Sequence, residues 1–512
     1  MSFTSPSYLL FLPVTIILYY VLPKRMQNAL LLLASAVFYW FNLPRLESGG
    51  RNYMPLVLIA ATTVFVYYIA LAIDKASGKK RTMLTAFAVI AMLCVLAIFK
   101  YSGYFIKTFF APHSLSALAF PLGISYYTFA CVAYIIDVSR RDIIAERGFI
   151  RTAVFVSFFA TITCGPICRA GKMLPQLASE RRFNAAKASD ALRLALVGFF
   201  KQIAVANIIG LFVNVVFKSP TDYSGMVLIT AAFGYAFQLY YEFSGFCDIA
   251  CATAMLFGLE IPQNFKTPYF STNFSGFWSR WHISLSTWLQ DYLFMPLVWS
   301  KWTSHIPVLG KKVQSPPMIT SVAIVFIVSG FWHGNTSLFV IWGIIQAVYR
   351  VSEELLHKYY KKPKKKPALL LRSFKTCGVF TLWSFSLIFF RLGSENSGIG
   401  GAIYYITHLF TKSENSFAAN AKAIIQRGFY PKNDMMVLLY IAFVVLVLAA
   451  AIYMDWYQCF KLKDAHISTV LTKLPLVLRW VVYYGFIGVI LVAFIMQSGG
   501  YGGNVSFAYG GF

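Results

Sequence analysis

Residues 433–454 read NDMMVLLYIAFVVLVLAAAIYM, and no charged side chain follows Asp434 within this stretch. A helix needs about 20 apolar residues to cross the hydrocarbon core of a bilayer. The run 476–497, LVLRWVVYYGFIGVILVAFIMQ, has the same character and carries a single arginine near its start. Both segments therefore predict transmembrane helices, which indicates an integral membrane protein built from helices.

The composition extends this interpretation to the whole chain. Of its 512 residues, 58% are hydrophobic and only 12% are charged, about half the usual share for a soluble domain. These values exclude soluble enzyme folds, disordered scaffolds and secreted disulfide modules. We expect an all-α polytopic membrane protein with roughly 11–13 transmembrane helices. Its further apolar segments lie at 7–22, 27–43, 53–73, 82–99, 117–136, 149–163, 191–217, 226–243, 318–332, 338–352 and 376–392.

The charge balance predicts the topology. The chain has 45 basic and 19 acidic residues, and in membrane proteins such an excess marks cytoplasmic loops. No nucleic-acid-binding motif accompanies it, so we expect the lipid bilayer as a partner and no nucleic acid. Both chain ends are then extracytoplasmic, and the outer segment 393–430 holds a surface helix near 400–410. The basic clusters assigned to the cytoplasm are 24–25, 75–81, 140–147 and 358–366.

Proline and glycine interrupt the middle of the chain. Breaks are expected at Pro121 to Gly123, at Gly165 with Pro166, and at Gly330. Interrupted helices at membrane depth are tolerated where they line a cavity or are packed in protein. The pattern therefore predicts an internal site. No small-residue cleavage site follows the first apolar run, so we expect that run to remain as a helix.

The stretch 274–297, FSGFWSRWHISLSTWLQDYLFMPL, carries the most unusual chemistry. Its tryptophans lie at helical spacing with other large side chains, which predicts one aromatic stripe. Polar groups this dense near a bilayer are costly and usually face a cavity or the protein interior. An amphipathic interfacial helix with an aromatic belt is the alternative. The candidate residues are Arg280, Trp281, His282, Ser286 and Asp291, with Ser286 one helical turn after His282.

Two further candidates follow. His333 ends an uncharged apolar run and has Gly330 and Gly334 beside it, so it could approach a substrate closely; a hydrogen bond to a neighbouring helix is the alternative. Gln238, Glu242 and Asp248 occur in a membrane-like segment, where an ionisable group needs a partner. We interpret these three as a supporting polar network.

Metal chemistry is not expected. The eight cysteines are scattered through apolar stretches, and Cys164 with Cys168, like Cys247 with Cys251, lacks the C-x-x-C spacing of zinc or redox sites. No histidines and carboxylates converge at ligand spacing. We predict no metal and no tightly bound cofactor.

The sequence resembles the membrane-bound O-acyltransferases, and within them the branch that acylates bacterial polysaccharides such as alginate. The motif RWHISLSTWLQDY at 280–292, GFWHG at 330–334, QLYYEFSGFCDIA at 238–250 and GPICRAGKMLPQL at 165–177 carry the resemblance. The likeness covers most of residues 1–355. Glu242 departs from the family pattern, in which aspartate is expected. The resemblance implies a fold with tilted helices around a thin central pore, entered by funnels from both faces.

The same resemblance implies the chemistry. The histidine that matches His333 is the general base, and the one that matches His282 orients the acceptor or donates to the thioester carbonyl. Trp281 and Trp332 would shape an acyl channel, with Ser286, Arg280 and Asp291 beside it. Acetyl-CoA or another acyl thioester would be the donor. The expected location is the bacterial inner membrane, and the expected partners are a surface polysaccharide and an extracytoplasmic SGNH-type transferase.

We expect a single integral-membrane domain over 1–512. It would comprise N-terminal helices (1–163), a catalytic core (164–355), C-terminal helices (356–497) and an outer tail (498–512). The tail ends in an F-x-Y-x-x-F pattern around Tyr509, which resembles the motif of an acyl-carrier peptide, so Tyr509 is a candidate acyl carrier. A tail resting on the interface is the alternative. The competing functions are D-alanylation of teichoic acid, lipid or protein acylation, and non-enzymatic transport.

Overall fold

The computed structural model describes residues 1–45, 50–109, 121–301, 316–359, 368–412, 416–429 and 433–498. These ranges are helical, and the β-interaction within them is one isolated bridge between Arg45 and Arg51. The described helices form two compact units. The first holds residues 1–195 and 246–263, and the second holds 196–245 and 264–498. Two helices contribute to both units: α8 (Ala185–Phe199) and α10 (Met226–Leu256).

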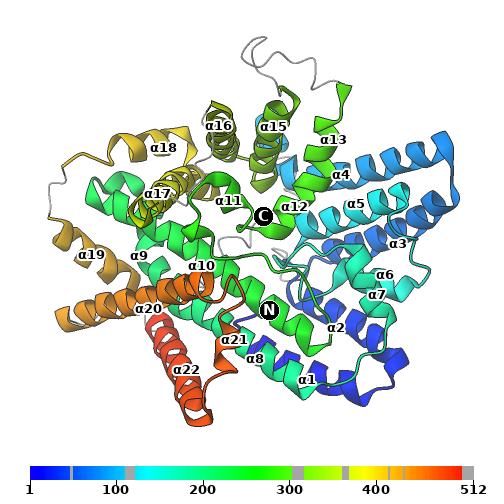
Figure 1. Ribbon diagram of the computed structural model, residues 1–512, viewed down its shortest axis with the longest axis horizontal. Helices are drawn as coiled ribbons and strands as arrows, with labels where there is room; N and C mark the ends of the chain where they lie inside the picture. Colours follow the sequence, from blue (N-terminus) through cyan, green and yellow to red (C-terminus); the bar gives the residue numbers. More distant parts are fainter. Residues whose placement is uncertain are drawn as a thin grey trace. The chain divides into compact units, whose positions relative to one another are not determined.

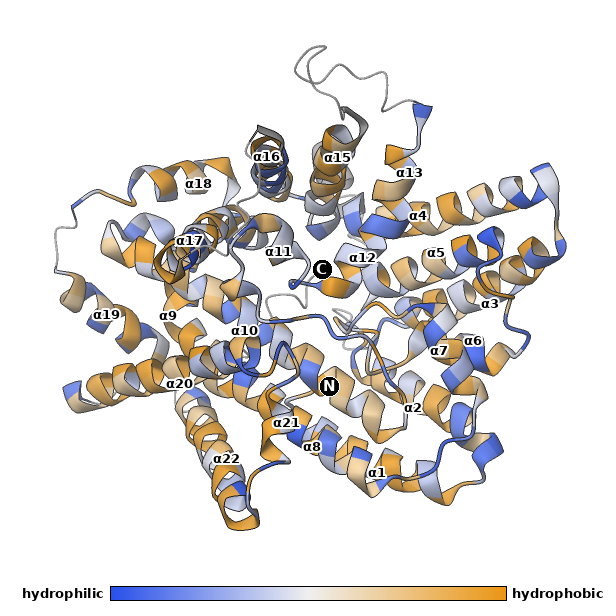
Figure 2. Ribbon diagram, in the orientation of Figure 1, coloured by the Kyte–Doolittle hydropathy of each residue, from blue (hydrophilic) through white to orange (hydrophobic). Residues whose placement is uncertain are grey.

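The helices confirm a polytopic membrane protein. Aliphatic side chains stay exposed along α20 and α22, which are orange over most of their length in Figure 2. Such exposure is costly in water and favourable in hydrocarbon. Six stretches of the described chain are long and apolar enough to cross a membrane: α3 (Met54–Lys75), Gly78–Tyr101 of α4 (Gly78–Phe109), Ala185–Lys218, α17 (Leu369–Ser394), α20 (Asp434–Phe460) and Leu476–Gln497 of α22 (Leu476–Ser498).

The first unit is built around α5 (Ile124–Arg140). This helix is buried along almost its whole length, which an apolar residue pattern on all sides favours. Gly123 begins it with φ +71°, and a Cβ there would lie 1.7 Å from the carbonyl oxygen of Ile162. Helix α5 therefore begins directly after Pro121 to Gly123, and Gly123 permits a close backbone contact. Besides α3, α4 and parts of α8 and α10, the unit holds α1 (Pro6–Val21), α2 (Gln27–Phe41), α6 (Phe149–Ser157) and α7 (Ala170–Ala178).

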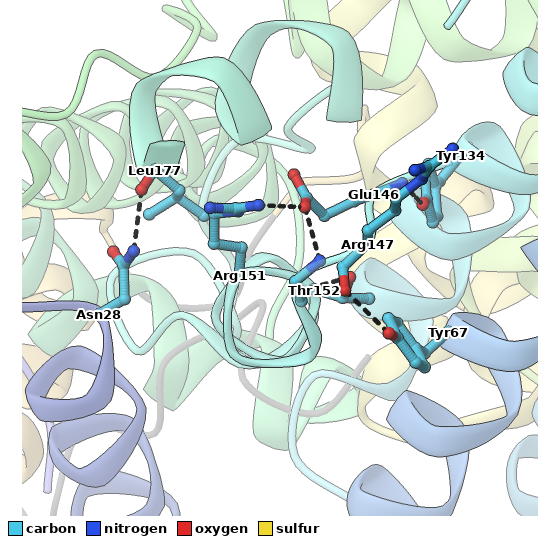
Figure 3. A network of polar contacts seen from close by, with 9 residues as sticks. Asn28, Tyr67, Tyr134, Glu146, Arg147, Arg151, Thr152 and Leu177 are labelled. Atoms are coloured by element: carbon cyan, nitrogen blue, oxygen red, sulfur yellow. Dashed lines mark hydrogen bonds and ion pairs between the residues drawn. The ribbon is translucent and has the colours of Figure 1, made fainter. Parts of the chain in front are cut away.

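Polar contacts hold the loop between α5 and α6 (Figure 3). The Glu146 carboxylate accepts from the Arg151 guanidinium at 2.5 Å and from the Gly148 N–H at 2.7 Å. Tyr134 accepts from the Glu146 N–H, and Tyr67 donates to the Arg147 carbonyl, each at 2.8 Å. These bonds satisfy loop groups that have no helical partner.

The second unit contains the two histidine motifs, 280–292 and 330–334, whereas the motif at 165–177 lies in the first unit. Helices α15 (Pro316–His333) and α16 (Ser337–Tyr359) pack along each other (Figure 1), and α17 packs on α16. Two π-helical stretches, η2 (Phe200–Ala206) and η5 (Gln290–Phe294), interrupt the regular helices. The remaining helices are α9 (Asn207–Lys218), α11 (Phe274–Trp278), α12 (Ile283–Leu289), α13 (Met295–Val298), α18 (Gly398–Thr407), α19 (Phe417–Phe429) and α21 (Ser468–Leu471).

Two local predictions are wrong. Gly330 does not interrupt α15, because the helix continues to His333. A Cβ at Gly330 would lie 2.4 Å from the Phe339 carbonyl oxygen, so this glycine allows α15 and α16 to approach closely. The aromatic stripe of 274–297 is not continuous either, because α11 ends at Trp278 and α12 begins at Ile283.

Candidate active site

His282 lies in the turn that separates α11 from α12. Its φ is +43° and its ψ +53°, a left-handed conformation that costs a residue other than glycine about 1–2 kcal/mol. A short segment beside the turn holds it in place. The Lys266 N–H donates to the Arg280 carbonyl, and the Ile283 N–H donates to the Asn264 carbonyl, each at 3.0 Å. The strained backbone is therefore fixed on both sides of His282.

The His282 side chain is 1% exposed. Its ring meets the Phe243 ring edge-on, with 4.9 Å between centroids. The turn lies outside the candidate membrane-spanning helices. Burial lowers the pKa of the His282 imidazole from 6.5 to about 3, because a low-dielectric surrounding disfavours the charged ring. His282 is therefore neutral at physiological pH.

His333 is the last residue of α15 and is 3% exposed. Its ring packs against Trp332 at 4.8 Å and against Trp342 and Phe390 at 5.1 Å. The following Gly334 cannot carry a side chain, since a Cβ would lie 2.1 Å from the Phe339 ring. The predicted glycine-flanked histidine is thus enclosed by aromatic rings.

Four tryptophans join the surroundings of the two histidines. We call Trp278, Trp281, Trp342 and Trp383 the tryptophan cluster. Trp281, which precedes His282, lies 4.9 Å from Trp383, and Trp342, which touches His333, lies 6.3 Å from Trp383 and 6.2 Å from Trp278. A continuous path of ring contacts therefore runs from the turn of His282 to the ring of His333.

A cavity of about 430 Å³ lies in the same unit. Ile283, the neighbour of His282, and Ser329, one turn before His333, both line it. Helix α15 supplies an apolar wall, and α11, α12 and η5 supply hydroxyl and amide groups. The cavity is within the size range of small-molecule sites. Its lining includes Ser275, Trp278, Ser279, Ser286, Thr287, Gln290, Val322, Val325, Phe326 and Arg350.

Comparison with known proteins decides the family. Residues 138–392 match the model of the membrane-bound O-acyltransferase family. The chain is 33% identical to the probable alginate O-acetylase AlgI of Pseudomonas aeruginosa over 70% of its own length and 66% of that protein. The chain belongs to the membrane-bound O-acyltransferase family.

Relatives within this family carry different names. The peptidoglycan O-acetyltransferase of Helicobacter pylori is 29% identical over 78% of this chain and 78% of its own length. The teichoic acid D-alanyltransferase of Bacillus subtilis is 28% identical over 50% of this chain and 64% of its own length. The relatives are thus named for three different polymers: alginate, peptidoglycan and teichoic acid.

The residues predicted to line the acyl channel lie in different surroundings in this O-acyltransferase-family chain. Trp281 and Trp332 are buried beside the histidines, and Ser286 lines the cavity. Arg280 is half-buried and forms an ion pair with Asp464 at 2.8 Å. Asp291 is exposed on η5 and does not line the cavity. Tyr509 lies outside the described residues.

The polar network has members that the sequence did not reveal. Asn214 accepts from Gln238 at 3.3 Å and from Arg391 at 3.1 Å. Arg391 also pairs with Glu395 at 2.7 Å. Glu242 is buried one turn after Gln238, whereas Asp248 belongs to the first unit. Arg391 is a charged residue at the end of an otherwise apolar run, and this position could have indicated that it belongs to the polar network.

Proposed function

We propose that this chain transfers an acetyl group from a cytoplasmic thioester donor, across the membrane, to hydroxyl groups of a cell-surface polysaccharide. The observation that carries the proposal is the pair of buried histidines, connected by the tryptophan cluster. A cavity lined by Ile283 and Ser329, but by neither histidine, lies in the same unit. Three relatives support the proposal, since they are named for O-acetylation of alginate, O-acetyl transfer to peptidoglycan and D-alanyl transfer to teichoic acid.

The proposed chemistry has three requirements. A hydroxyl must lose its proton as it attacks the thioester carbon, the developing oxyanion needs a donor, and water must be kept out. His333 accepts the hydroxyl proton. The carbon–sulfur bond then breaks, and the proton passes to the leaving thiolate. His282, neutral because it is buried, donates an N–H to the carbonyl oxygen or orients the acceptor. The aromatic rings around both histidines exclude water.

The cavity supports the donor side of the proposal. An acyl thioester presents an apolar chain beside polar amide groups, and the lining offers both kinds of surface. Val322 and Val325 would contact the apolar part, whereas Thr287 and Gln290 would bond the amides. Acetyl-CoA is the donor that we propose, and a carrier-protein thioester is the alternative.

The acceptor side rests on the predicted topology. The basic loops predict an extracytoplasmic tail, in which Tyr509 would take the acetyl group as a tyrosyl ester. An extracytoplasmic SGNH-type partner would then pass it to sugar. In a strain that lacks the chromosomal gene, Tyr509→Phe is expected to abolish this relay while the protein still reaches the membrane. Full polymer acetylation by this variant would refute the carrier role.

The function itself is tested by chemical analysis of the envelope. Deletion of the gene should remove base-labile acetate from a surface polysaccharide, and the wild-type copy should restore it. Base-labile D-alanine lost in place of acetate would support the teichoic acid alternative. Unchanged esters of both kinds would contradict the proposal and favour a transporter.

A further inference from the structure

The turn that carries His282 is held from a part of the chain beyond the family match. That match ends at residue 392, whereas the loop after α20 contacts Arg280 in the turn. The Arg280 guanidinium donates to the Asp464 carboxylate at 2.8 Å, to the Lys266 carbonyl at 3.0 Å and to Thr267 Oγ1 at 3.4 Å. One side chain thus joins three separate pieces of backbone within the second unit.

The loop is itself rigidly placed. Lys463 and Asp464 both have left-handed backbones, with φ of +51° and +68°. The Asp464 N–H donates to the Gln458 carbonyl at 3.0 Å, and the buried Gln458 side chain accepts from the Ile467 N–H at 3.2 Å. The carboxylate of Asp464 is therefore presented by a structured loop.

A buried contact anchors α20, from which this loop extends. The Tyr241 hydroxyl donates to Asp455 Oδ2 at 3.1 Å, and Asp455 is 5% exposed. Close by in sequence, Phe460 packs edge-on against Phe270 at 5.7 Å. Hence the loop is fixed relative to both α10 and the segment that pairs with the His282 turn.

We propose that Asp464 is a positioning residue: through Arg280 it holds the paired segments 264–267 and 280–284 so that His282 keeps its left-handed backbone. The Arg280–Asp464 pair is partly exposed, with 30% and 25% of the two side chains accessible. Partly exposed pairs of this kind contribute little to stability. We therefore expect the pair to affect the position of His282 and not the stability of the fold. A displaced group near the reacting atoms can cost up to about 100-fold in rate.

The inference rests on the proposed role of His282, and the test separates the two. Asp464→Gly removes the carboxylate and keeps the left-handed backbone permissible. Lys463→Gly is the matched control, because it makes the same backbone change at the adjacent exposed residue, which bears no such carboxylate. Asp464→Asn retains one acceptor oxygen and should restore part of the activity.

Transfer is measured in membrane vesicles with radioactive acetyl-CoA, as counts that mild base releases from polymer. Asp464→Gly should lower kcat about tenfold, with KM for acetyl-CoA and the thermal unfolding midpoint unchanged. Lys463→Gly should match the wild type. In an Arg280→Gln background the ion pair is already lost, so Asp464→Gly removes only the acceptor of Thr267 Oγ1 and should lower kcat much less than it does in the wild type. Equal kcat in the two glycine variants, or additive effects with Arg280→Gln, would overturn the inference.

Hydrogen exchange supplies a readout that does not depend on activity. The N–H groups of Ile283 and Ser284 donate to Asn264, so Asp464→Gly should accelerate exchange in peptides covering 264–284 and leave α22 unchanged. Unaltered exchange there would refute the positioning role. His282→Ala is measured alongside, because full activity in that variant would refute the role of His282, whereas the exchange data report the positioning of the turn separately.

Discussion

At the scale of single residues, His282 combines a strained backbone with a buried, neutral ring. Strained residues persist where the surrounding structure holds them, and they cluster at active sites. The sequence predicted this histidine through its aromatic and polar neighbours. It could not predict the left-handed turn, because a regular pattern of tryptophans at helical spacing indicated an unbroken helix.

His282→Asn tests whether the imidazole or only the turn is required. Asparagine tolerates the left-handed conformation better than most residues, so the fold should be retained. Since the imidazole is removed, we expect transfer to fall at least about tenfold. Thermal unfolding in detergent and the vesicle assay measure the two properties. Near-normal transfer by this variant would show that the ring takes no part in the chemistry.

At the scale of elements, most predicted apolar segments overlap observed helices, because a long apolar run favours a membrane helix. Roughly 11–13 crossings were expected, whereas six stretches of the described chain are long and apolar enough to cross a membrane, and the segment 149–163 is helical only as α6. The surface helix expected near 400–410 is found as α18. Side-chain contacts between distant segments could not be predicted. The contacts of Asp464 and Asn214 could not be predicted from their neighbours in sequence, because each residue bonds a partner far along the chain.

The contact between α15 and α16 gives a prediction at this scale. Gly330→Ala places a methyl group 2.4 Å from a backbone oxygen, and such overpacking costs about 1–3 kcal/mol. The helices must separate, which moves His333 away from Trp342. We expect a lower unfolding midpoint and reduced transfer. Gly378→Ala in α17 is the control, because nothing lies within 4 Å of the new methyl group; equal behaviour of the two variants would contradict the packing argument.

At the scale of the whole molecule, transfer across a membrane requires the two ends of the reaction to face different compartments. The distribution of basic clusters predicts that the tail is outside. Alkaline phosphatase fused after Phe512 folds into its active form only outside the cytoplasm, so the fusion should be active. A cytoplasmic reporter fused at the same position should then be silent, and the reverse result would contradict the proposed direction of transfer.

The most direct test of the account is acyl transfer by purified His333→Ala. The enzyme is reconstituted in lipid vesicles with the extracytoplasmic partner, radioactive acetyl-CoA and surface polysaccharide from the deletion strain, and His408→Ala serves as a control away from the tryptophan cluster. We predict a loss of at least about 100-fold for His333→Ala, as expected when a general base is removed, and a normal rate for the control. A His333→Ala enzyme that transfers acetyl groups at the rate of the control would contradict the central claim that the buried histidine pair carries the reaction.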